Sequence, residues 1–323
     1  MEVFNLTLTQ MLVMFVIMLT GYILKKGNFI PDDSSAVMSR LLAFVLAPAL
    51  TLNNQILTCT PKTFAENSLL IIYGLVIVLV AIGLSYPLSA LFVRNRKKSP
   101  GLAYQQQIYK YALTFGNFSY MGSYIILGIW GDEMLFKYNM FTFVMNIIVY
   151  VWGLYVLVPK SLNSKGILGN LKSGLLTPPF ISLVLGMFLG LTGISKFVPS
   201  FVTSSLKSAG DCMGPMAMLL AGIVIGEYDF SELLGDKKVY LATLLRLIIL
   251  PGVFAGVLNL LNVNHDIIVI TLIAYATPMG LNTIVFPAAY GGNTKIGASM
   301  TMISSTLSII TIPIMYYIFA VLL

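Results

Sequence analysis

Charged residues, histidine and cysteine are all scarce in this sequence. Only 10% of its 323 residues are charged, and it contains one histidine and two cysteines. A soluble domain of this length needs far more polar surface. Cys59 and Cys212 lack metal-ligand spacing, so we expect neither a metal site nor a disulfide framework. The sequence also lacks a phosphate-binding loop and a set of nucleophiles, bases or ligands, so we predict neither an ATP-driven pump nor an enzyme, and no cofactor.

Long uncharged apolar runs are what the sequence has instead. The hydrophobic fraction is 58% and the mean hydropathy is +0.90, and about 20 helical residues suffice to cross a hydrocarbon core. We therefore predict an all-α integral membrane protein with ten transmembrane helices. The N-terminal segment has Glu2 and no basic n-region, so we expect it to stay as the first span. The predicted spans are 6–24, 35–53, 68–93, 108–129, 138–158, 175–193, 199–226, 239–261, 267–290 and 296–323.

Lysine and arginine are distributed unevenly between alternate loops. One set of loops holds Lys25, Lys26, Arg40, Arg94, Arg96, Lys97, Lys98, Lys110, Lys160, Lys165, Lys172, Lys237, Lys238 and Lys295, and the other holds only Lys62, Lys137 and Lys196. Basic loops stay in the cytoplasm. This predicts a multi-pass protein of the cell membrane with both termini extracytoplasmic. The net charge of +7 is explained by this topology and by anionic lipid, and no nucleic-acid partner is predicted.

The two halves of the chain, 1–160 and 161–323, resemble an internal repeat. Arg40 lies eight positions before Pro48, and Lys207 lies eight positions before Pro215. A unit with an odd number of spans reverses its orientation when it is duplicated. Spans 1–5 and 6–10 are therefore predicted to form two five-helix inverted repeats, whose exchange of conformations gives a carrier inward-open and outward-open states.

The fourth and ninth spans carry polar, glycine-punctuated or proline-punctuated stretches at 115–122 and 276–283. Proline and glycine interrupt a helix, and asparagine offers both a donor and an acceptor. A carboxylate could then be held at a helix N-terminus without a formal positive charge. Kinking or close packing is the alternative explanation, but matching positions in an inverted repeat favour a binding site. Its candidate residues are Gly116, Asn117, Ser119, Gly122, Pro278, Gly280, Asn282 and Thr283.

Several ordered motifs resemble the auxin efflux carrier family over nearly the whole chain. They are 20–26, 30–31, 46–50, 116–117 and 121–122 in the first half, and 177–179, 214–222, Pro278 and Gly280 in the second. Bacterial members of that family are associated with malate and related organic acids. Two differences from the usual pattern concern the interrupted helices. Tyr124 replaces a proline after the first interruption, and Thr283 replaces one found in plant relatives.

This resemblance implies a fold similar to that of the bile-acid symporters, with broken, crossing helices four and nine. Spans 1, 2, 6 and 7 would form a scaffold, and spans 3–5 and 8–10 a moving transport domain in an elevator mechanism. It also implies a homodimer that forms through the scaffold. The residues that it transfers to this chain are Asn117, Pro278 and Gly280.

Three ionisable groups within predicted spans need a role, because charge is costly inside a membrane. Lys207 and Asp211 are four residues apart and are expected to form a structural pair. The alternative is that Asp211, one turn deeper, carries a coupling proton. Arg246 either snorkels to the interface or attracts an anionic substrate.

We therefore predict a secondary transporter for a small organic anion, with an anion channel or a transporter-like membrane sensor as the alternative.

Overall fold

The computed structural model describes residues 2–93, 99–157, 175–289 and 294–322. Every element in these ranges is helical, and a single isolated bridge joins Gly116 to Met279. The predicted all-α class is confirmed. The basic loop at 94–98, the basic residues Lys160, Lys165 and Lys172, and the predicted repeat boundary at 160 lie outside the described residues.

The first half is a series of helices interrupted by short π-helical turns. It contains α1 (Glu2–Lys26), α2 (Ser34–Leu41), η1 (Leu42–Leu46), α3 (Ala47–Thr58), α4 (Pro61–Asn67), α5 (Leu69–Phe92), α6 (Pro100–Thr114), η3 (Phe118–Gly122), α7 (Ser123–Ile148), η4 (Val149–Gly153) and α8 (Leu154–Leu157).

The second half is also a series of helices interrupted by short turns. It contains α10 (Pro178–Leu191), η5 (Ile194–Phe197), α11 (Ser200–Asp211), α12 (Met213–Gly226), α13 (Phe230–Leu234), α14 (Lys237–Leu244), η6 (Leu245–Ile249), α15 (Leu250–Leu260), α16 (His265–Ala276), α17 (Asn282–Ala289), α18 (Lys295–Tyr316) and η7 (Tyr317–Leu322).

Seven helical stretches among the described residues are long and apolar enough to cross a membrane. They are 5–26, 34–58, 61–92, 118–157, 200–226, 237–260 and 295–320, and α10 and α16 are shorter apolar helices. The stretch 118–157 joins parts of the predicted fourth and fifth spans, with a sharp turn at Gly131, whose φ is +77°. The multi-pass class is thereby supported, whereas the count of ten spans and their inverted orientation stay predictions.

Both prolines that mark the repeat lie at helix interruptions. Pro48 is at the start of α3, directly after the π-helical turn η1. Pro215 is at the start of α12, after a turn at Cys212 that ends α11. Proline lacks an N–H and clashes with the preceding turn of a helix, so each interruption has a local cause in the sequence.

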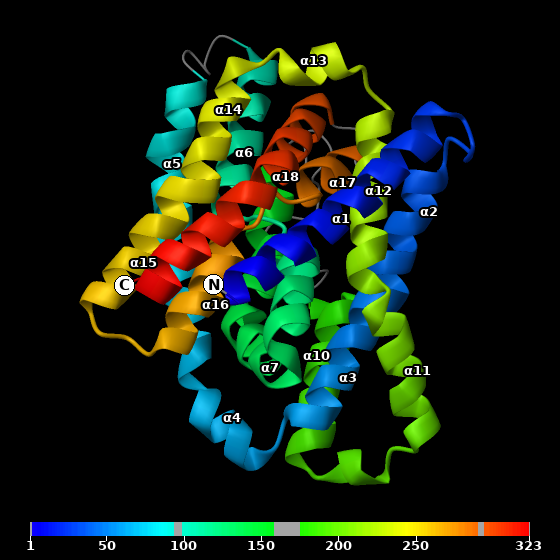
Figure 1. Cartoon of the computed structure of the whole chain (residues 1–323), viewed down its shortest axis with the longest axis vertical. Helices are drawn as coiled ribbons and strands as arrows, with labels where there is room; N and C mark the ends of the chain where they lie inside the picture. The colour runs from blue at the N-terminus through cyan, green and yellow to red at the C-terminus, as the bar shows by residue number, and fades with distance from the viewer. Residues whose placement is uncertain (1, 94–98, 158–174, 290–293, 323) are drawn as a thin grey trace.

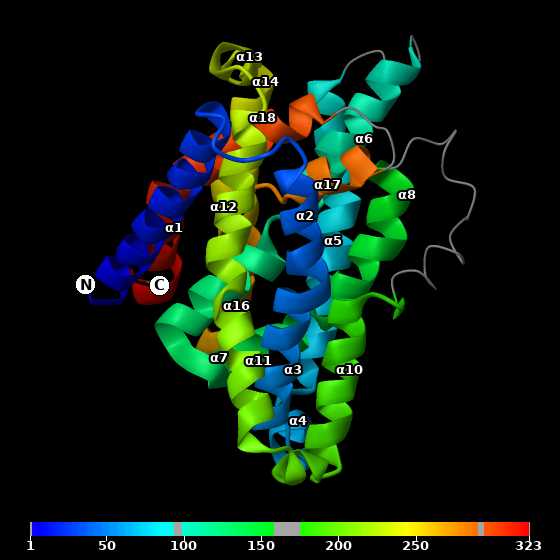
Figure 2. The same cartoon turned by 90° about the vertical axis from the view of Figure 1, so that its right-hand side faces the viewer.

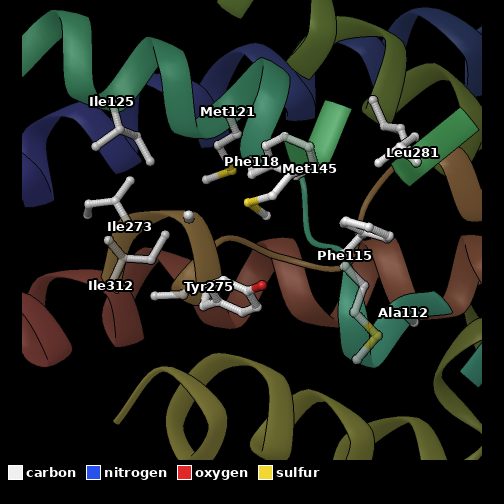
Figure 3. Close-up of a cluster of buried hydrophobic side chains, with 14 of the residues drawn as sticks. Ala112, Phe115, Phe118, Met121, Ile125, Met145, Ile273, Tyr275, Leu281 and Ile312 are labelled. Atoms are coloured by element: carbon white, nitrogen blue, oxygen red, sulfur yellow. The ribbon is translucent and has the colours of Figure 1, made fainter. Parts of the chain in front are cut away.

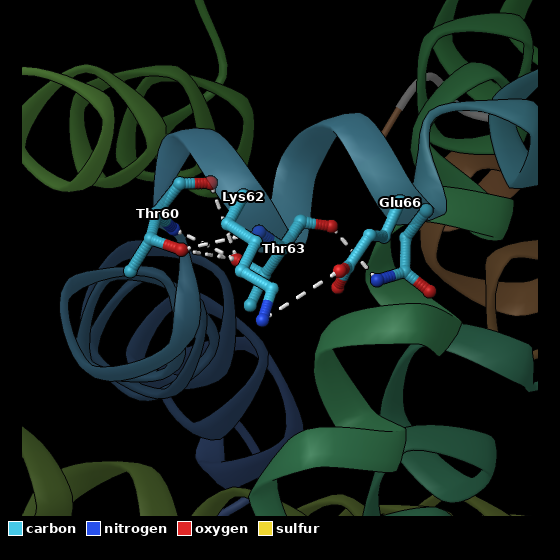
Figure 4. Close-up of polar contacts among 5 residues, drawn as sticks. Thr60, Lys62, Thr63 and Glu66 are labelled. Carbon is cyan, nitrogen blue, oxygen red and sulfur yellow. Dashed lines mark hydrogen bonds and ion pairs between the residues drawn. The ribbon is translucent and has the colours of Figure 1, made fainter.

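Long helices run side by side along the long axis of the molecule (Figures 1 and 2). α12 packs on α1, whose Gly21 approaches the Leu219 backbone so closely that a Cβ would overlap it, and α3 packs between α10 and α11. In a second group, α5 packs on α6 and α7, and α16 packs on α15, α18 and α7. The short α4 links α3 to α5 and is capped by a reciprocal pair of hydrogen bonds between Thr60 and Thr63, with Lys62 and Glu66 on its surface (Figure 4).

Candidate functional site

The two predicted helix interruptions meet at the centre of the molecule. α6 ends at Thr114 and the helix resumes at Phe118, whereas α16 ends at Ala276 and α17 begins at Asn282. The Asn117 N–H donates to the Pro278 carbonyl at 2.7 Å, beside the antiparallel bridge from Gly116 to Met279. Figure 3 shows Phe115 and Phe118 on the first interrupted segment and Leu281 on the second, with Tyr275 in the last turn of α16. We call this pair of segments the crossover.

Glycine at two positions allows the two backbones to cross. A Cβ added to Gly280 would lie 2.8 Å from the Gly116 carbonyl oxygen. A Cβ added to Gly116 would overlap the Arg246 guanidinium and the Thr277 hydroxyl. Neither position has room for a side chain, so the pairing of the two segments explains these glycines physically.

Four helix ends meet at the crossover. Two are carboxyl ends, those of α6 and α16, and two are amino ends, those of the η3–α7 helix and of α17. The first N–H groups of a helix lack intrahelical acceptors and carry partial positive charge. Asn117 immediately precedes η3 and makes no side-chain cap. The crossover therefore places two partially positive helix ends side by side.

A small polar cavity, of about 30 Å³, lies against these amino ends. Asn117 is 6% exposed, and its side chain makes no hydrogen bond with the described residues. Asn282 donates its amide to the Tyr111 hydroxyl at 2.9 Å. No charged residue is in the described lining, which consists of Gly116, Asn117, Phe118, Ser119, Tyr120, Asn146, Val149, Gly280, Leu281 and Asn282.

The structure brings together five of the predicted residues and places three others behind them. Gly116, Asn117, Ser119, Gly280 and Asn282 line the cavity. The other three support the crossover: Pro278 accepts the hydrogen bond from Asn117, Thr283 donates to the Gly280 carbonyl at 2.9 Å, and Gly122 packs against the Tyr138 hydroxyl. The break is present despite Tyr124, because α6 ends before Phe115.

Asn146 is a lining residue that we did not predict. It belongs to a polar row on α7 with Asn139 and Thr142, at a spacing of three and four residues that puts them on one helix face. This row faces α3 and α10 across a second cavity, of about 50 Å³, which shares Ser119, Tyr120 and Asn146 with the first. The sequence pattern that could have identified this row is a set of polar residues at helical spacing in an otherwise apolar span.

A third and larger cavity adjoins the crossover at Leu281. Its volume is about 520 Å³, and we call it the vestibule. Its wall is mostly apolar, with Arg40 and Glu227 as charged residues among those described. The lining consists of Ser35, Ala36, Ser39, Arg40, Ala43, Phe44, Leu220, Val224, Glu227, Leu281, Ile284 and Thr294.

On another side of the crossover, α3 and α7 are joined directly. The Asn54 amide donates to the Asp132 carbonyl at 3.0 Å, and Asn139 donates to the Asn54 side-chain oxygen at 2.9 Å. Asn54 is 1% exposed. The vestibule is thus bordered by α2, η1, α12 and α17, whereas near Asp132 the Asn54 side chain ties α3 to α7.

The ionisable residues have different surroundings. Lys207 and Asp211 form an ion pair at 3.0 Å, with side chains 60% and 50% exposed within the chain. The predicted pair is present, and the burial that a proton-coupling role for Asp211 requires is not provided by the described residues. Arg246 is 0% exposed and donates to the Ala274 carbonyl at 3.3 Å. The snorkelling interpretation of Arg246 is therefore wrong, and Arg246 is not among the residues that line the three cavities.

Apolar helices and a polar crossover between two interrupted helices define a multi-pass membrane protein of the transporter class. Residues 6–316 match the profile of the family described as membrane transport protein, so the chain belongs to this family of transporters. The resemblance to auxin efflux carriers is confirmed. The chain is also similar to the uncharacterized transporter MJ1031 of Methanocaldococcus jannaschii, with 22% identity over 307 residues that cover 93% of this chain and 95% of that protein.

Proposed function

We propose that this protein is a secondary carrier that binds a small organic anion, such as a mono- or dicarboxylate, at the crossover. The meeting of two helix amino ends beside a cavity lined by neutral amides and hydroxyls carries this proposal. Such ends favour anions. A carboxylate in the cavity would accept hydrogen bonds from the amino end of η3 and from the Asn117 amide, which has no partner among the described residues.

The unequal surroundings of the crossover support alternating access. The vestibule is lined by Arg40 and Thr294, which belong to or border the loops predicted to be cytoplasmic, and it adjoins the crossover at Leu281. Near Asp132, which is predicted to be extracytoplasmic, Asn54 joins α3 to α7. A large cavity on the side predicted to be cytoplasmic, and hydrogen bonds that join α3 to α7 near the opposite side, favour an inward-facing carrier over a channel.

The two packing groups support a division into a scaffold and a transport domain. α1 packs on α12, and α3 packs on α10 and α11, within the proposed scaffold. Within the proposed transport domain, α5 packs on α6 and on α7, and α16 packs on α15, whereas the contact of α1 with α18 lies between the two groups. Movement of the second group along the first would carry the crossover across the membrane. A homodimer formed through the scaffold, with lipid around it, completes the proposal.

Counterflow in proteoliposomes tests this function. Vesicles loaded with unlabelled malate, succinate, lactate, benzoate or indole-3-acetate are diluted into the same labelled acid at low concentration. A carrier is expected to accumulate label transiently above the external concentration with at least one acid. A channel gives equilibration without this overshoot, and a sensor gives binding without flux. Failure of all acids to show counterflow would refute the organic-anion carrier proposal.

A further inference from the structure

Arg246 is an intramembrane cation whose charge has no acidic partner in the described part of the chain. It lies in the π-helical turn η6, between α14 and α15, and is among the largest fully buried side chains. No described carboxylate lies within 4.0 Å of it. A buried charge is stable only where other groups compensate it.

Backbone and aromatic groups of the crossover provide part of this compensation, whereas Nε and Nη1 of Arg246 are buried without a hydrogen-bond partner among the described residues. Nη2 donates to the carbonyl of Ala274, in the last turn of α16, and the guanidinium lies 5.0 Å from the Tyr275 ring centroid. The last carbonyls of a helix carry partial negative charge and favour a cation, and the face of a tyrosine ring does the same. The charge of Arg246 is thus directed at the carboxyl end of the second interrupted helix.

Arg246 also touches the first interrupted segment. Its Nη2 occupies the space where a Cβ of Gly116 would be, and Thr277 packs at the same point. Gly116 in turn lines the crossover cavity. The guanidinium therefore lies directly behind the cavity wall, separated from it by a residue without a side chain.

We propose that Arg246 is a positioning residue that neutralises the carboxyl end of α16 behind the crossover and makes the cavity in front electropositive, without touching the substrate. This proposal rests on the proposed function only for its biological purpose. The electrostatic claim itself concerns the cavity and is independent of which substrate binds there. Partial charges of opposite sign would otherwise meet at the crossover and largely cancel, whereas a cation at the carboxyl end leaves the positive amino ends dominant.

Charge-selective cysteine labelling tests the claim without a substrate. Leu281→Cys places a thiol where the vestibule meets the crossover cavity, in a background with Cys212→Ser, because Cys212 is exposed and Cys59 is buried. The probes are a methanethiosulfonate with a sulfonate group and one with a trimethylammonium group. The measured quantity is the ratio of their reaction rates, anionic over cationic.

Arg246→Gln is expected to lower this ratio about tenfold, because a unit charge behind the cavity wall, in a weakly polar medium, acts oppositely on the two probes. Arg246→Lys keeps the charge, so its ratio is expected to stay within about twofold of the parent while its melting temperature falls. Lys62→Gln, which removes an exposed cation on α4, serves as the net-charge control and is expected to change nothing.

An unchanged ratio in Arg246→Gln, or an equal fall in Arg246→Lys, would overturn the proposal. If Arg246→Gln does not fold, the protein that retains Arg246 provides the test. Its Leu281→Cys site must favour the anionic probe at least about tenfold over the reference ratio of native Cys212, measured in the chain without Leu281→Cys. Equal ratios at the two sites refute the claim. Counterflow can fail while the ratio of labelling rates still depends on Arg246. The two experiments therefore distinguish failure of the carrier proposal from failure of the proposal for Arg246.

Discussion

The two interrupted segments occupy corresponding positions in the halves of the chain, yet they are held differently. In the second, Thr283 donates to the Gly280 carbonyl, the Met279 N–H donates to the Ser304 hydroxyl, and Asn282 donates to Tyr111. In the first, Asn117 uses its backbone on Pro278 and has an amide without a partner among the described residues. The two interruptions thus differ in what they offer: the polar groups of the second are bonded within the protein, whereas the first has an amide without a partner among the described residues.

The largest expected effect comes from forcing the two segments apart. Gly280→Ala puts a Cβ 2.8 Å from the Gly116 carbonyl oxygen, and overpacking of this kind costs about 1–3 kcal/mol. We expect a lower melting temperature in detergent and loss of transport. Gly83→Ala on α5 is the matched control, because no described atom lies within 4 Å of its added Cβ.

Gly83→Ala removes a flexible glycine from a helix and is expected to be neutral or to stabilise the protein by about 0.5–1 kcal/mol. Equal stability of Gly280→Ala and Gly83→Ala would show that the crossover accommodates a methyl group by shifting. The close approach of the two backbones would then not explain the glycine at 280.

The next effect separates binding from folding at the first segment. Asn117→Ala removes an amide that is free to bind a carboxylate, and such a charged hydrogen bond contributes about 1.5–3 kcal/mol. We expect the dissociation constant of the transported acid to rise about tenfold or more. Because the amide supports nothing else among the described residues, the melting temperature should stay nearly constant. Titration calorimetry beside melting curves measures both.

The opposite result is a lower melting temperature with unchanged affinity in the Asn117→Ala protein that remains folded. It would contradict the role of Asn117 in substrate binding. It would make the first segment a packing element, as a kink without ligand contact would be. Asn117→Leu sharpens the result, since its bulk should weaken binding further if a ligand occupies the cavity.

The place of the crossover was predictable because its causes are local. Proline and glycine interrupt helices wherever they stand, so 115–122 and 276–283 could be identified from residue types alone. The same locality explains the success at Lys207 and Asp211, four residues apart on one helix.

Contacts between distant segments were not predictable. Arg246 reaches the Ala274 carbonyl, a backbone group that no residue type marks. The sequence showed only an isolated cation, for which snorkelling and attraction of an anionic substrate were both open. Asn282 and Tyr111 are 171 residues apart. Their pairing could not be read from a pattern, so Asn117 and Asn282 looked equivalent in the sequence.

The smallest expected effect tests this difference between the asparagines. Tyr111→Phe removes the hydroxyl that accepts from Asn282 and leaves the ring in its buried position, against Phe115 and Trp152. A neutral hydrogen bond contributes about 0.5–1.5 kcal/mol net. If Asn282 acts through a fixed orientation, losing this acceptor should raise the dissociation constant by about threefold, less than the loss of Asn117 does.

The double variant Tyr111→Phe with Asn282→Ala makes the comparison quantitative. When the hydroxyl acts only by orienting the amide, Tyr111→Phe has no additional effect on binding once Asn282 is alanine, and the two changes are strongly non-additive. Independent effects would instead multiply. If the effects multiply, the Tyr111 hydroxyl makes its own contact with the substrate. Both segments would then present free polar groups to the cavity, and the difference between them would not hold.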